Sequence, residues 1–285
     1  MKLSVVIPAF NAERDLPGQL AALSAQEWDG EWEVVVADNG STDRTVEVAR
    51  TFARDLPALR VVDASEMSGQ AFALNCGIAA STGEAILVLD ADDEVAPGYV
   101  AAMAVALEDA AFVAARLDCD ALNLPWVRES RPSAQTAGVG DAFGFLPAAV
   151  GCSLGLRRSL IDEHGDFDMA MPVCQDIDLS WRYGLAGVNV HFVADAVVRY
   201  RYRTDLGGIF RQARGYGVSG PLLYGRYRAA GMPRRSLHGQ ARFWLGPIRR
   251  LLRARTRGDF AAVVFLVGYR VGLLQGSWRA KVLYV

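Results

Sequence analysis

The first 110 residues alternate short runs of aliphatic and β-branched residues with longer Ala-rich polar stretches. The runs are LSVVIP, EVVVAD, LRVVDA and AILVLD, and they are followed by helix-like stretches at 12–25, 42–54, 70–81 and 97–108. Unbroken apolar runs of this length are typical of strands buried on both faces, and their alternation with helices implies right-handed βαβ units. We therefore expect an α/β fold with a Rossmann-like, mostly parallel sheet flanked by helices. Such sheets bind ligands at the carboxyl ends of their strands.

The pattern changes after residue 110. Gly and Pro interrupt the segment 110–150, which predicts a strand and a loop that covers the sheet. The segment 151–203 predicts two helices, the second over 176–185, and then two strands at VNVHFV and AVVRYRY. From about Leu206 the chain is Arg-rich and mainly helical, which predicts a domain over 1–205 and a helical extension over 206–285.

The formal net charge of −2 conceals an acidic body and a basic tail. Residues 1–198 carry 12 basic and 30 acidic side chains, whereas residues 199–285 carry 18 basic and 2 acidic ones. The acidic body suggests that it uses a cation, and the basic tail suggests contact with phosphates or an anionic membrane. Nucleic acid is a weaker partner, because the acidic body would repel it and no recognised binding motif is present.

The segment 248–257, IRRLLRARTR, predicts an amphipathic helix. Its apolar residues share one face and its arginines surround the others, which suits a helix lying on anionic lipid. Nearby Phe243, Trp244 and Trp278 would serve as interfacial anchors. The alternative, weighed equally, is a helix that packs on the main domain or forms a homodimer contact.

The location expected for the chain is the cytoplasm, with peripheral contact at the inner face of the membrane. The apolar N-terminal run stops at Pro8, too early for a signal peptide, and the apolar stretch Phe260–Leu274 is shorter than a spanning helix requires. The four cysteines show no CxxC spacing, so neither a zinc site nor a disulfide framework is indicated.

Acidic residues stand where two of the predicted strands end. Asp90 ends AILVLD and is followed by Asp92 and Asp93 in LDADDE. A carboxylate at the end of a buried strand requires a partner, and Asp90 and Asp92 can turn towards one divalent cation. Hard oxygen ligands favour Mg²⁺ or Mn²⁺. The alternative is that the triplet turns the chain and caps the helix near Pro97.

Asp38, at the end of EVVVAD, has two interpretations of equal weight. It can accept a base N–H from a nucleotide, or it can serve the tight turn at Asn39-Gly40. Downstream, Ser41 or Thr42 is expected to cap the next helix.

Five segments in order resemble the family 2 glycosyltransferases, which are inverting enzymes of the GT-A fold. The segments are SVVIPAFNAE at 4–13, VVVADNGSTDRT at 34–45, GQAFALNCGIAASTGEAILVLDADD at 69–93, GDFD at 165–168 and QDIDLSWR at 175–182. The resemblance covers roughly residues 1–203. It implies a metal-dependent transfer of a sugar from a nucleotide-diphosphate sugar, UDP-linked before dTDP-linked, to an acceptor hydroxyl, in cell-surface glycan or glycoconjugate synthesis.

The resemblance also implies roles for individual residues. Asp92 with Asp90 would bind the metal, Asp176 would be the catalytic base, and Gln175 would lie on the acceptor side. The donor nucleotide would contact the remaining matched positions, which are Pro8, Ala9, Phe10, Glu13, Asp38, Asn75, Asp90 and Ala91. Judged by residue type alone, Phe10 would be a core residue and Glu13 a solvated helix residue.

A single base with a metal suffices for inverting transfer, since the base removes the acceptor proton while a cation stabilises the leaving diphosphate. Residue type alone leaves helix capping as the alternative for Asp176, and an i, i+4 ion pair for Asp178 with Arg182.

The chain departs from the family pattern at three positions. Tyr200 stands near the place after the last strand where many members have a His that completes the metal site. Gln175 stands where a Glu usually precedes the base, and Leu74 stands where an Arg often precedes Asn75. These departures keep open a non-catalytic protein that binds sugar nucleotides. A nucleotidyltransferase on a related sheet is a further alternative, although PAFNAERD lacks its usual Gly-rich basic loop. The acceptor stays open among a glycan, a lipid-linked molecule and a small metabolite.

Overall fold

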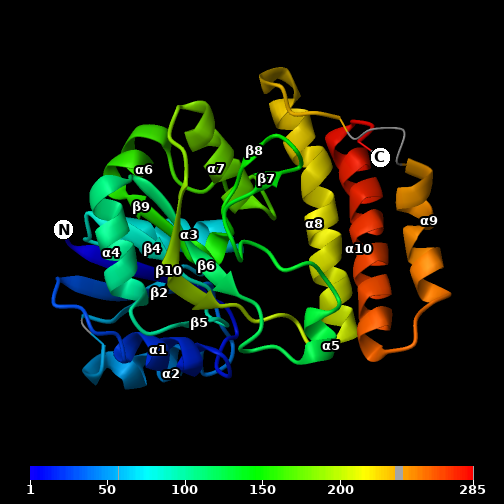
Figure 1. Cartoon of the computed structure of the whole chain (residues 1–285). Helices are drawn as coiled ribbons and strands as arrows, with labels where there is room; N and C mark the ends of the chain where they lie inside the picture. The colour runs from blue at the N-terminus through cyan, green and yellow to red at the C-terminus, as the bar shows by residue number, and fades with distance from the viewer. Residues whose placement is uncertain (57, 235–239, 285) are drawn as a thin grey trace. The chain divides into compact units, whose positions relative to one another are not determined.

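A computed structural model describes residues 1–56, 58–234 and 240–284. The chain forms two compact units (Figure 1). Unit 1 contains residues 1–118, 135–140 and 147–200, and unit 2 contains residues 119–134, 141–146 and 201–285. Unit 2 therefore combines two short segments from the middle of the chain with the basic C-terminal region.

Unit 1 is built on an eight-stranded sheet of order β3-β2-β1-β4-β9-β6-β10-β5. Strands β3, β2, β1 and β4 are parallel neighbours, β6 is parallel to β10, and β9 and β5 are antiparallel to the strands beside them. The strands are β1 Leu3–Ala9, β2 Trp32–Asp38, β3 Arg60–Asp63, β4 Ala85–Val88, β5 Glu94–Val95, β6 Phe112–Asp118, β9 Leu154–Arg157 and β10 His191–Arg199. Every residue of β1, β2 and β4 is buried, as their unbroken apolar runs predict.

Helices connect these strands and cover the sheet. They are α1 Leu16–Ser24, α2 Thr45–Thr51, η1 Phe52–Arg54, α3 Gln70–Ala80, α4 Tyr99–Asp109, η2 Gly151–Ser153, α6 Arg158–His164 and α7 Gln175–Leu185. Helix α3 packs on β1 and β2, and α4 packs on β6 and β10. The predicted alternation of strands and helices over the first 110 residues is confirmed.

Three strands of the sheet differ from the prediction. Strand β5 has only two residues and was not predicted. Strand β9 was not predicted, because its four residues LGLR contain a glycine and show no pattern of their own. The two runs VNVHFV and AVVRYRY form one strand, β10, whose pairing with β6 is interrupted by a bulge between Val193 and Val197. A bulge places extra residues on one strand, so the sequence pattern breaks where the strand does not.

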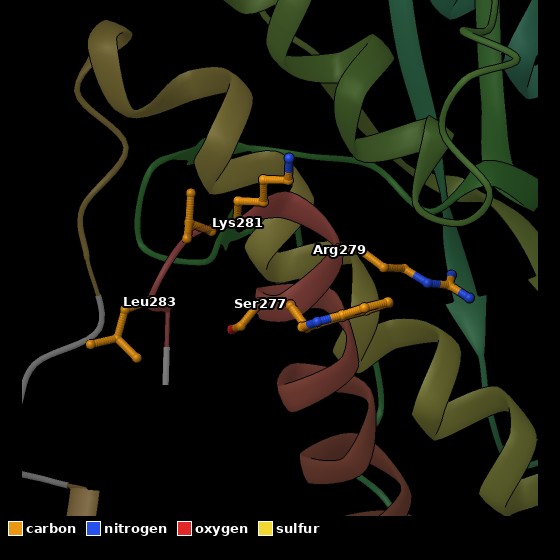
Figure 2. A pocket seen from close by; sticks show the side chains of 6 residues that line it. Ser277, Arg279, Lys281 and Leu283 are labelled. Atoms are coloured by element: carbon orange, nitrogen blue, oxygen red, sulfur yellow. The ribbon is translucent and has the colours of Figure 1, made fainter.

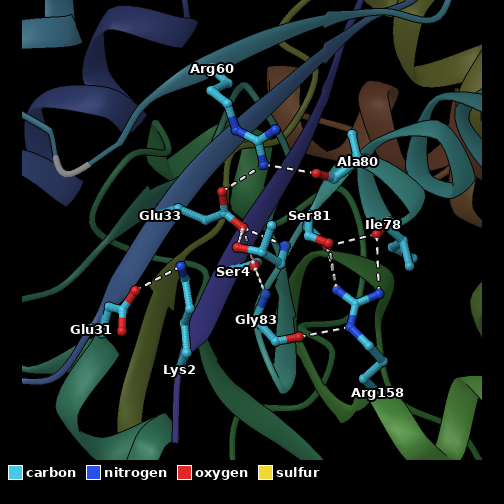
Figure 3. Close-up of polar contacts among 11 residues, drawn as sticks. Lys2, Ser4, Glu31, Glu33, Arg60, Ile78, Ala80, Ser81, Gly83 and Arg158 are labelled. Carbon is cyan, nitrogen blue, oxygen red and sulfur yellow. Dashed lines mark hydrogen bonds and ion pairs between the residues drawn. The ribbon is translucent and has the colours of Figure 1, made fainter.

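A buried polar network ties together the amino-terminal ends of β1 and β2 (Figure 3). The Glu33 carboxylate accepts hydrogen bonds from the hydroxyl of Ser4 at 2.8 Å and from the Thr82 hydroxyl at 2.8 Å, and it pairs with Arg60 at 2.6 Å. Burial opposes ionisation of Glu33, but the bonds from Thr82, Ser4 and Arg60 outweigh it and lower the pKa of Glu33 to about 2. The buried Glu33 carboxylate therefore stays charged inside the sheet because its oxygens accept several hydrogen bonds.

Unit 2 consists mainly of helices. They are α5 Pro125–Arg128, α8 Leu206–Tyr227, η3 Arg228–Ala230, α9 Gln240–Leu251 and α10 Arg257–Ala280. A short pair of strands, β7 Asp141–Ala142 and β8 Leu146–Pro147, lies between α5 and α8 in the sequence. Helix α10 packs against α8 and α9, as Figure 1 shows for the helices coloured red, yellow and orange. Pro247 lies inside α9, although a Gly-Pro pair such as Gly246-Pro247 usually marks a helix break.

Helices α8 and α10 approach closely because glycines lie at their contact. A Cβ on Gly268 would lie 2.7 Å from the carbonyl oxygen of Phe210, and one on Gly276 would lie 2.5 Å from that of Val218. Gly268, Gly272 and Gly276 recur every four residues and therefore share one face of α10. Helix α10 is also long and apolar enough to cross a membrane, with a mean hydropathy of 1.5 over its most apolar window, but 44% of that window is buried. A buried helix of a globular protein meets the same criterion.

Candidate functional site

The carboxyl ends of β1 and β2 lie side by side. Ala9 is the register partner of Asp38, and the Asn39 amide donates to the carbonyl of Ala9 at 2.8 Å. Pro8 and Ala9 are buried, whereas the side chain of Phe10 is 61% exposed. The interpretation of Phe10 as a core residue is therefore wrong. Its ring is available at the edge where a parallel sheet binds ligands.

The loop after β2 is bound to the loop after β1. The Asn11 amide donates to the Ser41 hydroxyl at 2.9 Å, and the Thr42 amide donates to Oδ1 of Asn11 at 2.8 Å. The expectation that Ser41 or Thr42 caps a helix is wrong, since α2 begins only at Thr45 and Arg44 precedes it as the cap. The polar residues of this turn instead hold the two strand ends together.

Glu13 also bonds to the loop after β2 and does not lie in bulk solvent. Its carboxylate accepts from the Arg44 amide at 3.1 Å, and its backbone amide donates to Asp43 at 3.1 Å. Its Oε2 also lies 3.5 Å from the Arg44 guanidinium. Glu13 thus fixes the loop beside the strand ends.

Asp38 has one engaged and one unengaged oxygen. Its Oδ2 accepts from the Ser41 amide at 3.2 Å, which satisfies the turn interpretation. Its Oδ1 is buried and has no hydrogen-bond partner among the described residues. A buried oxygen without a partner is costly, so this atom can serve a ligand as well.

A chain of side-chain amides connects Asp90 with the beginning of α7. Nε2 of Gln70 donates to Oδ1 of Asp90 at 2.8 Å, and Nε2 of Gln175 donates to Oε1 of Gln70 at 3.0 Å. The Asp90 carbonyl also accepts from Gln19 at 3.2 Å. Sequence reasoning missed Gln70, because nothing local indicates that the first residue of α3 meets residues 20 and 105 positions away.

The structure brings Asp90 together with Asp93 and Cys152. One ligand atom of each lies within 4.8 Å of the others, which makes this a group of described residues able to hold a metal ion. Asp92 is half-buried and is not part of that group, and Ala91 between them is buried. Asp93 is fully buried. The third carboxylate of LDADDE was visible in the sequence, but no signal pointed to Cys152.

The donor set of this cluster suits a hard cation. Burial, and then the nearby Asp93 carboxylate, raise the pKa of the Cys152 thiol well above its ordinary value. A protonated thiol is a poor ligand for Mg²⁺ or Mn²⁺, whereas carboxylates are good ones. The residues present therefore fit such an ion through their carboxylates.

Asp176 lies in the first turn of α7 and contacts the loop at η2. Its Oδ2 accepts from the Gly151 amide at 2.9 Å, and its Oδ1 accepts from the Ile177 amide at 2.9 Å. Burial raises the pKa of Asp176, although these amide bonds oppose the change. A carboxylate with a raised pKa is a stronger base than an ordinary aspartate. The neighbouring Asp178 pairs with Arg182 at 3.0 Å, which confirms the expected i, i+4 pair.

The side chains of Asn75 and Leu74 make contacts within the fold. The Asn75 amide group donates to the carbonyl of Phe167 at 2.8 Å and accepts from its amide at 3.2 Å, which holds the GDFD loop. Leu74 is 2% exposed and lies in the main core of unit 1. The apolar residue found where the family often has Arg thus packs inside the fold.

The chain is similar to proteins of known class. It is 40% identical over 126 residues to the uncharacterized glycosyltransferase YibD of Escherichia coli, covering 44% of this chain and 34% of that protein. It is 32% identical over 111 residues to the dodecaprenyl-phosphate galacturonate synthase of Rhizobium johnstonii, covering 38% of this chain and 33% of that protein. The chain thus spans about a third of the length of these relatives.

A solved structure and a family model complete the comparison. The mannosyltransferase PcManGT from Pyrobaculum calidifontis, in complex with GDP-Man and Mn²⁺, has a TM-score of 0.65 at 21% identity, covering 95% of this chain and 86% of that one. This similarity confirms the GT-A fold. The model of glycosyl transferase family 2 matches residues 4–165, which is more than half of the chain. With this match, the chain belongs to glycosyl transferase family 2.

Proposed function

We propose that this chain is an inverting, metal-dependent glycosyltransferase in which Asp176 is the catalytic base. The observation that carries the proposal is the environment of Asp176, a carboxylate oriented by two backbone amides and made more basic by burial. Through Gln175 and Gln70, the start of its helix is connected to Asp90 at the end of β4. A base and a diphosphate site on one sheet edge are what inverting transfer requires.

In the proposed reaction, Asp176 takes the proton from the acceptor hydroxyl while that oxygen attacks the anomeric carbon. The bond between this carbon and the diphosphate oxygen breaks on the opposite face, and the electron pair leaves with the nucleoside diphosphate. The fixed amide contacts of Asp176 hold its carboxylate in place during the transfer, which lowers the entropic cost of the step. Gln175 lies on the acceptor side of this arrangement.

The donor base is proposed to bind at the ends of β1 and β2. Asp38 offers one buried oxygen, because the other accepts from Ser41. Uracil and thymine each present a single ring N–H between two carbonyls, so they match one acceptor, whereas guanine presents two donors side by side. We therefore propose a UDP-sugar first and a dTDP-sugar second, with the exposed ring of Phe10 against the base and Pro8 and Ala9 as the floor.

The diphosphate is proposed to lie over Asp90, Ala91 and Asp92. Asp92 with Asp90 would hold Mg²⁺ or Mn²⁺, and Asp93 would support them from the buried side. When bound, the ion supplies positive charge to the leaving diphosphate. Asn75 contributes by holding the GDFD loop, and Glu13 by holding the loop at the base site.

The proposed acceptor is a hydroxyl of a glycan, a lipid-linked sugar or a small molecule, in the synthesis of a cell-surface glycan or glycoconjugate. One relative is named for a polyprenyl-phosphate product, which supports the lipid-linked class. A cytoplasmic location at the inner face of the membrane suits such an acceptor and the basic character of residues 199–285.

A thermal-shift screen of UDP-, dTDP- and GDP-sugars, with Mn²⁺ and with EDTA, tests the donor and the metal. We expect UDP-sugars to raise the Tm of the protein only when Mn²⁺ is present, and slow hydrolysis of the same donor without acceptor. Full activity in EDTA would contradict metal dependence. Release of pyrophosphate would indicate a nucleotidyltransferase, and donor binding without turnover across a broad acceptor screen would indicate a non-catalytic protein.

A further inference from the structure

Helix α10 exposes a row of apolar side chains on the side away from its glycine face. The α10 stripe consists of Phe260, Val267, Val271, Leu274 and Trp278, whose exposed fractions are 48, 39, 40, 53 and 82%. Spacings of seven, four, three and four residues place them on one face of the helix. Because Gly268, Gly272 and Gly276 pack on α8, the stripe has no role in that contact. Contiguous exposed apolar residues of this kind mark interaction surfaces.

The stripe ends at a shallow hollow that is lined by apolar and basic residues. The hollow has a volume of about 740 Å³ and is lined by Ser277, Trp278, Arg279, Lys281, Val282 and Leu283 (Figure 2). Arg279 and Lys281 are exposed and form no ion pair with any residue that the structure describes. Leu283 is 63% exposed. Apolar surface thus lies next to two uncompensated cations.

Helix α9 and the turn that follows it repeat this combination. Leu245, Ile248 and Leu252 are 44, 56 and 80% exposed and form an apolar flank, with the exposed Arg249 and Arg253 beside it. The helix is held on α10 by Arg270, which donates to the carbonyl of Phe243 at 3.0 Å and lies 4.0 Å from the centre of its ring. Its apolar flank is therefore left outside the contact with α10.

We propose that unit 2 binds an anionic phospholipid surface through the α10 stripe, the hollow and the α9 flank. The apolar side chains would enter the boundary between headgroups and acyl chains, and the arginines and Lys281 would contact lipid phosphates. This surface would account for the peripheral membrane location proposed above, and in that respect the inference rests on the proposed function. The occupant is anionic because residues 199–285 carry 18 basic and 2 acidic side chains.

The helix lies on the membrane and does not cross it. Its glycine face packs on α8, whose sequence contains Arg211 and Arg214, and a helix with these charges is poorly suited to the hydrocarbon core. Arg270 is 7% exposed in the middle of α10 and is used to hold α9. A helix pair with one apolar outer face and basic residues beside it instead suits the interface.

Co-sedimentation of the full chain with lipid vesicles tests the proposal. The vesicles contain phosphatidylcholine alone or with phosphatidylglycerol, each at low and high salt. We expect binding only with phosphatidylglycerol and weaker binding at high salt. Leu274→Ser with Trp278→Ser, and separately Arg249→Gln with Arg253→Gln, should each lower the partition coefficient about tenfold.

Matched variants in unit 1 provide the controls. Val105→Ser removes an apolar side chain that is 63% exposed on α4, and Arg50→Gln with Arg54→Gln removes two exposed arginines. These variants should bind vesicles like the unmodified chain. Equal binding to phosphatidylcholine, equal losses in the controls, or dimerisation that depends on the stripe would overturn the proposal. Resistance to alkaline extraction from membranes would overturn it in favour of a spanning helix.

The same preparations separate this proposal from the proposed function. The stripe variants should retain donor hydrolysis in solution, since their substitutions lie in unit 2 and all proposed site residues lie in unit 1. Vesicle binding without any donor turnover would refute the proposed function alone. Donor turnover without vesicle binding would refute the lipid surface alone.

Discussion

Strand β2 carries a buried carboxylate at each end, and the two have opposite surroundings. At the amino-terminal end, Glu33 is 3% exposed and is saturated by Ser4, Thr82 and Arg60 (Figure 3). At the carboxyl end, Asp38 is 8% exposed and keeps one oxygen without a hydrogen-bond partner in the described part of the chain. The first charge is compensated within the fold, whereas the second leaves a polar atom for a molecule outside it. The comparison separates an acidic residue whose charge the fold compensates from one that we propose binds a ligand.

The largest expected effect is a loss of transfer activity on replacing Asp176. Like Asp38, Asp176 is proposed to act on a bound substrate. Asp176→Asn should lower transfer about a thousandfold, because the acceptor proton loses its base. The free energy of unfolding should change little, because Asn removes the burial cost of the charge, which raises the pKa of Asp176, but leaves one of the two backbone amides without its acceptor. The cost of the buried carboxylate increases as pH rises from the pKa of Asp176 in the unfolded chain towards its raised pKa in the folded chain. Asn removes this pH-dependent cost. Initial rates and urea unfolding measured on the same sample test both expectations.

Asp178→Asn is the matched control, two residues further along α7. Asp178 is fully buried and pairs with Arg182 at 3.0 Å, so its loss should cost stability, about 2 kcal/mol, without removing the base. A stable Asp176→Asn protein that keeps full transfer activity would refute the role of Asp176.

The next effect concerns Asp38 directly. Asp38→Asn should weaken UDP binding about tenfold or more, because a charged acceptor of the base N–H is lost, while the free energy of unfolding changes by less than about 1 kcal/mol. Asp63→Asn is the control, since Asp63 ends β3 as the register partner of Asp38 but is exposed. Calorimetric titration with UDP in the presence of Mn²⁺ measures the difference. Equal affinities of the two variants would remove Asp38 from the donor site.

Glu33→Gln should show the reverse profile, a loss of stability with unchanged transfer per folded molecule. The folded pKa of Glu33 is about 2 against an ordinary value of 4.5, so its contribution is complete above pH 4.5 and disappears as pH falls towards 2. We expect a loss of roughly 2 to 3 kcal/mol at neutral pH and a flatter acid dependence of stability.

Urea unfolding across this pH range measures the effect of Glu33→Gln, with Glu31→Gln as the control. Glu31 pairs with Lys2 at 2.7 Å, but its side chain is 73% exposed, so its replacement should cost less than about 0.5 kcal/mol. A comparable loss of stability in both variants would mean that the buried network stabilises the fold no more than the exposed ion pair does.

The same contrast explains what the sequence could predict. Strands β1, β2 and β4 were evident because their residues are all apolar or strand-forming and buried on both faces. The carboxylates at their ends were recognisable because a charge after such a run requires a partner. Cys152 and Gln70 were not, because their proximity to Asp90 arises only when distant segments fold together. Phe10 was misjudged by residue type, since a large apolar ring at a ligand edge resembles a core residue in sequence.

The smallest expected effect tests the amide chain that joins the two carboxylate sites. Gln70 donates to Asp90, so its oxygen must accept, and Gln175 supplies the donor. Gln175→Glu would place a carboxylate against that oxygen and a negative charge beside Asp176, raising the pKa of the base further. The acid limb of the pH profile of kcat should move up by roughly half a unit to one unit. Gln175→Met removes the hydrogen bond without adding charge, so its acid limb should stay in place. If both variants give the same limb, the neutral residue at 175 does not tune the base.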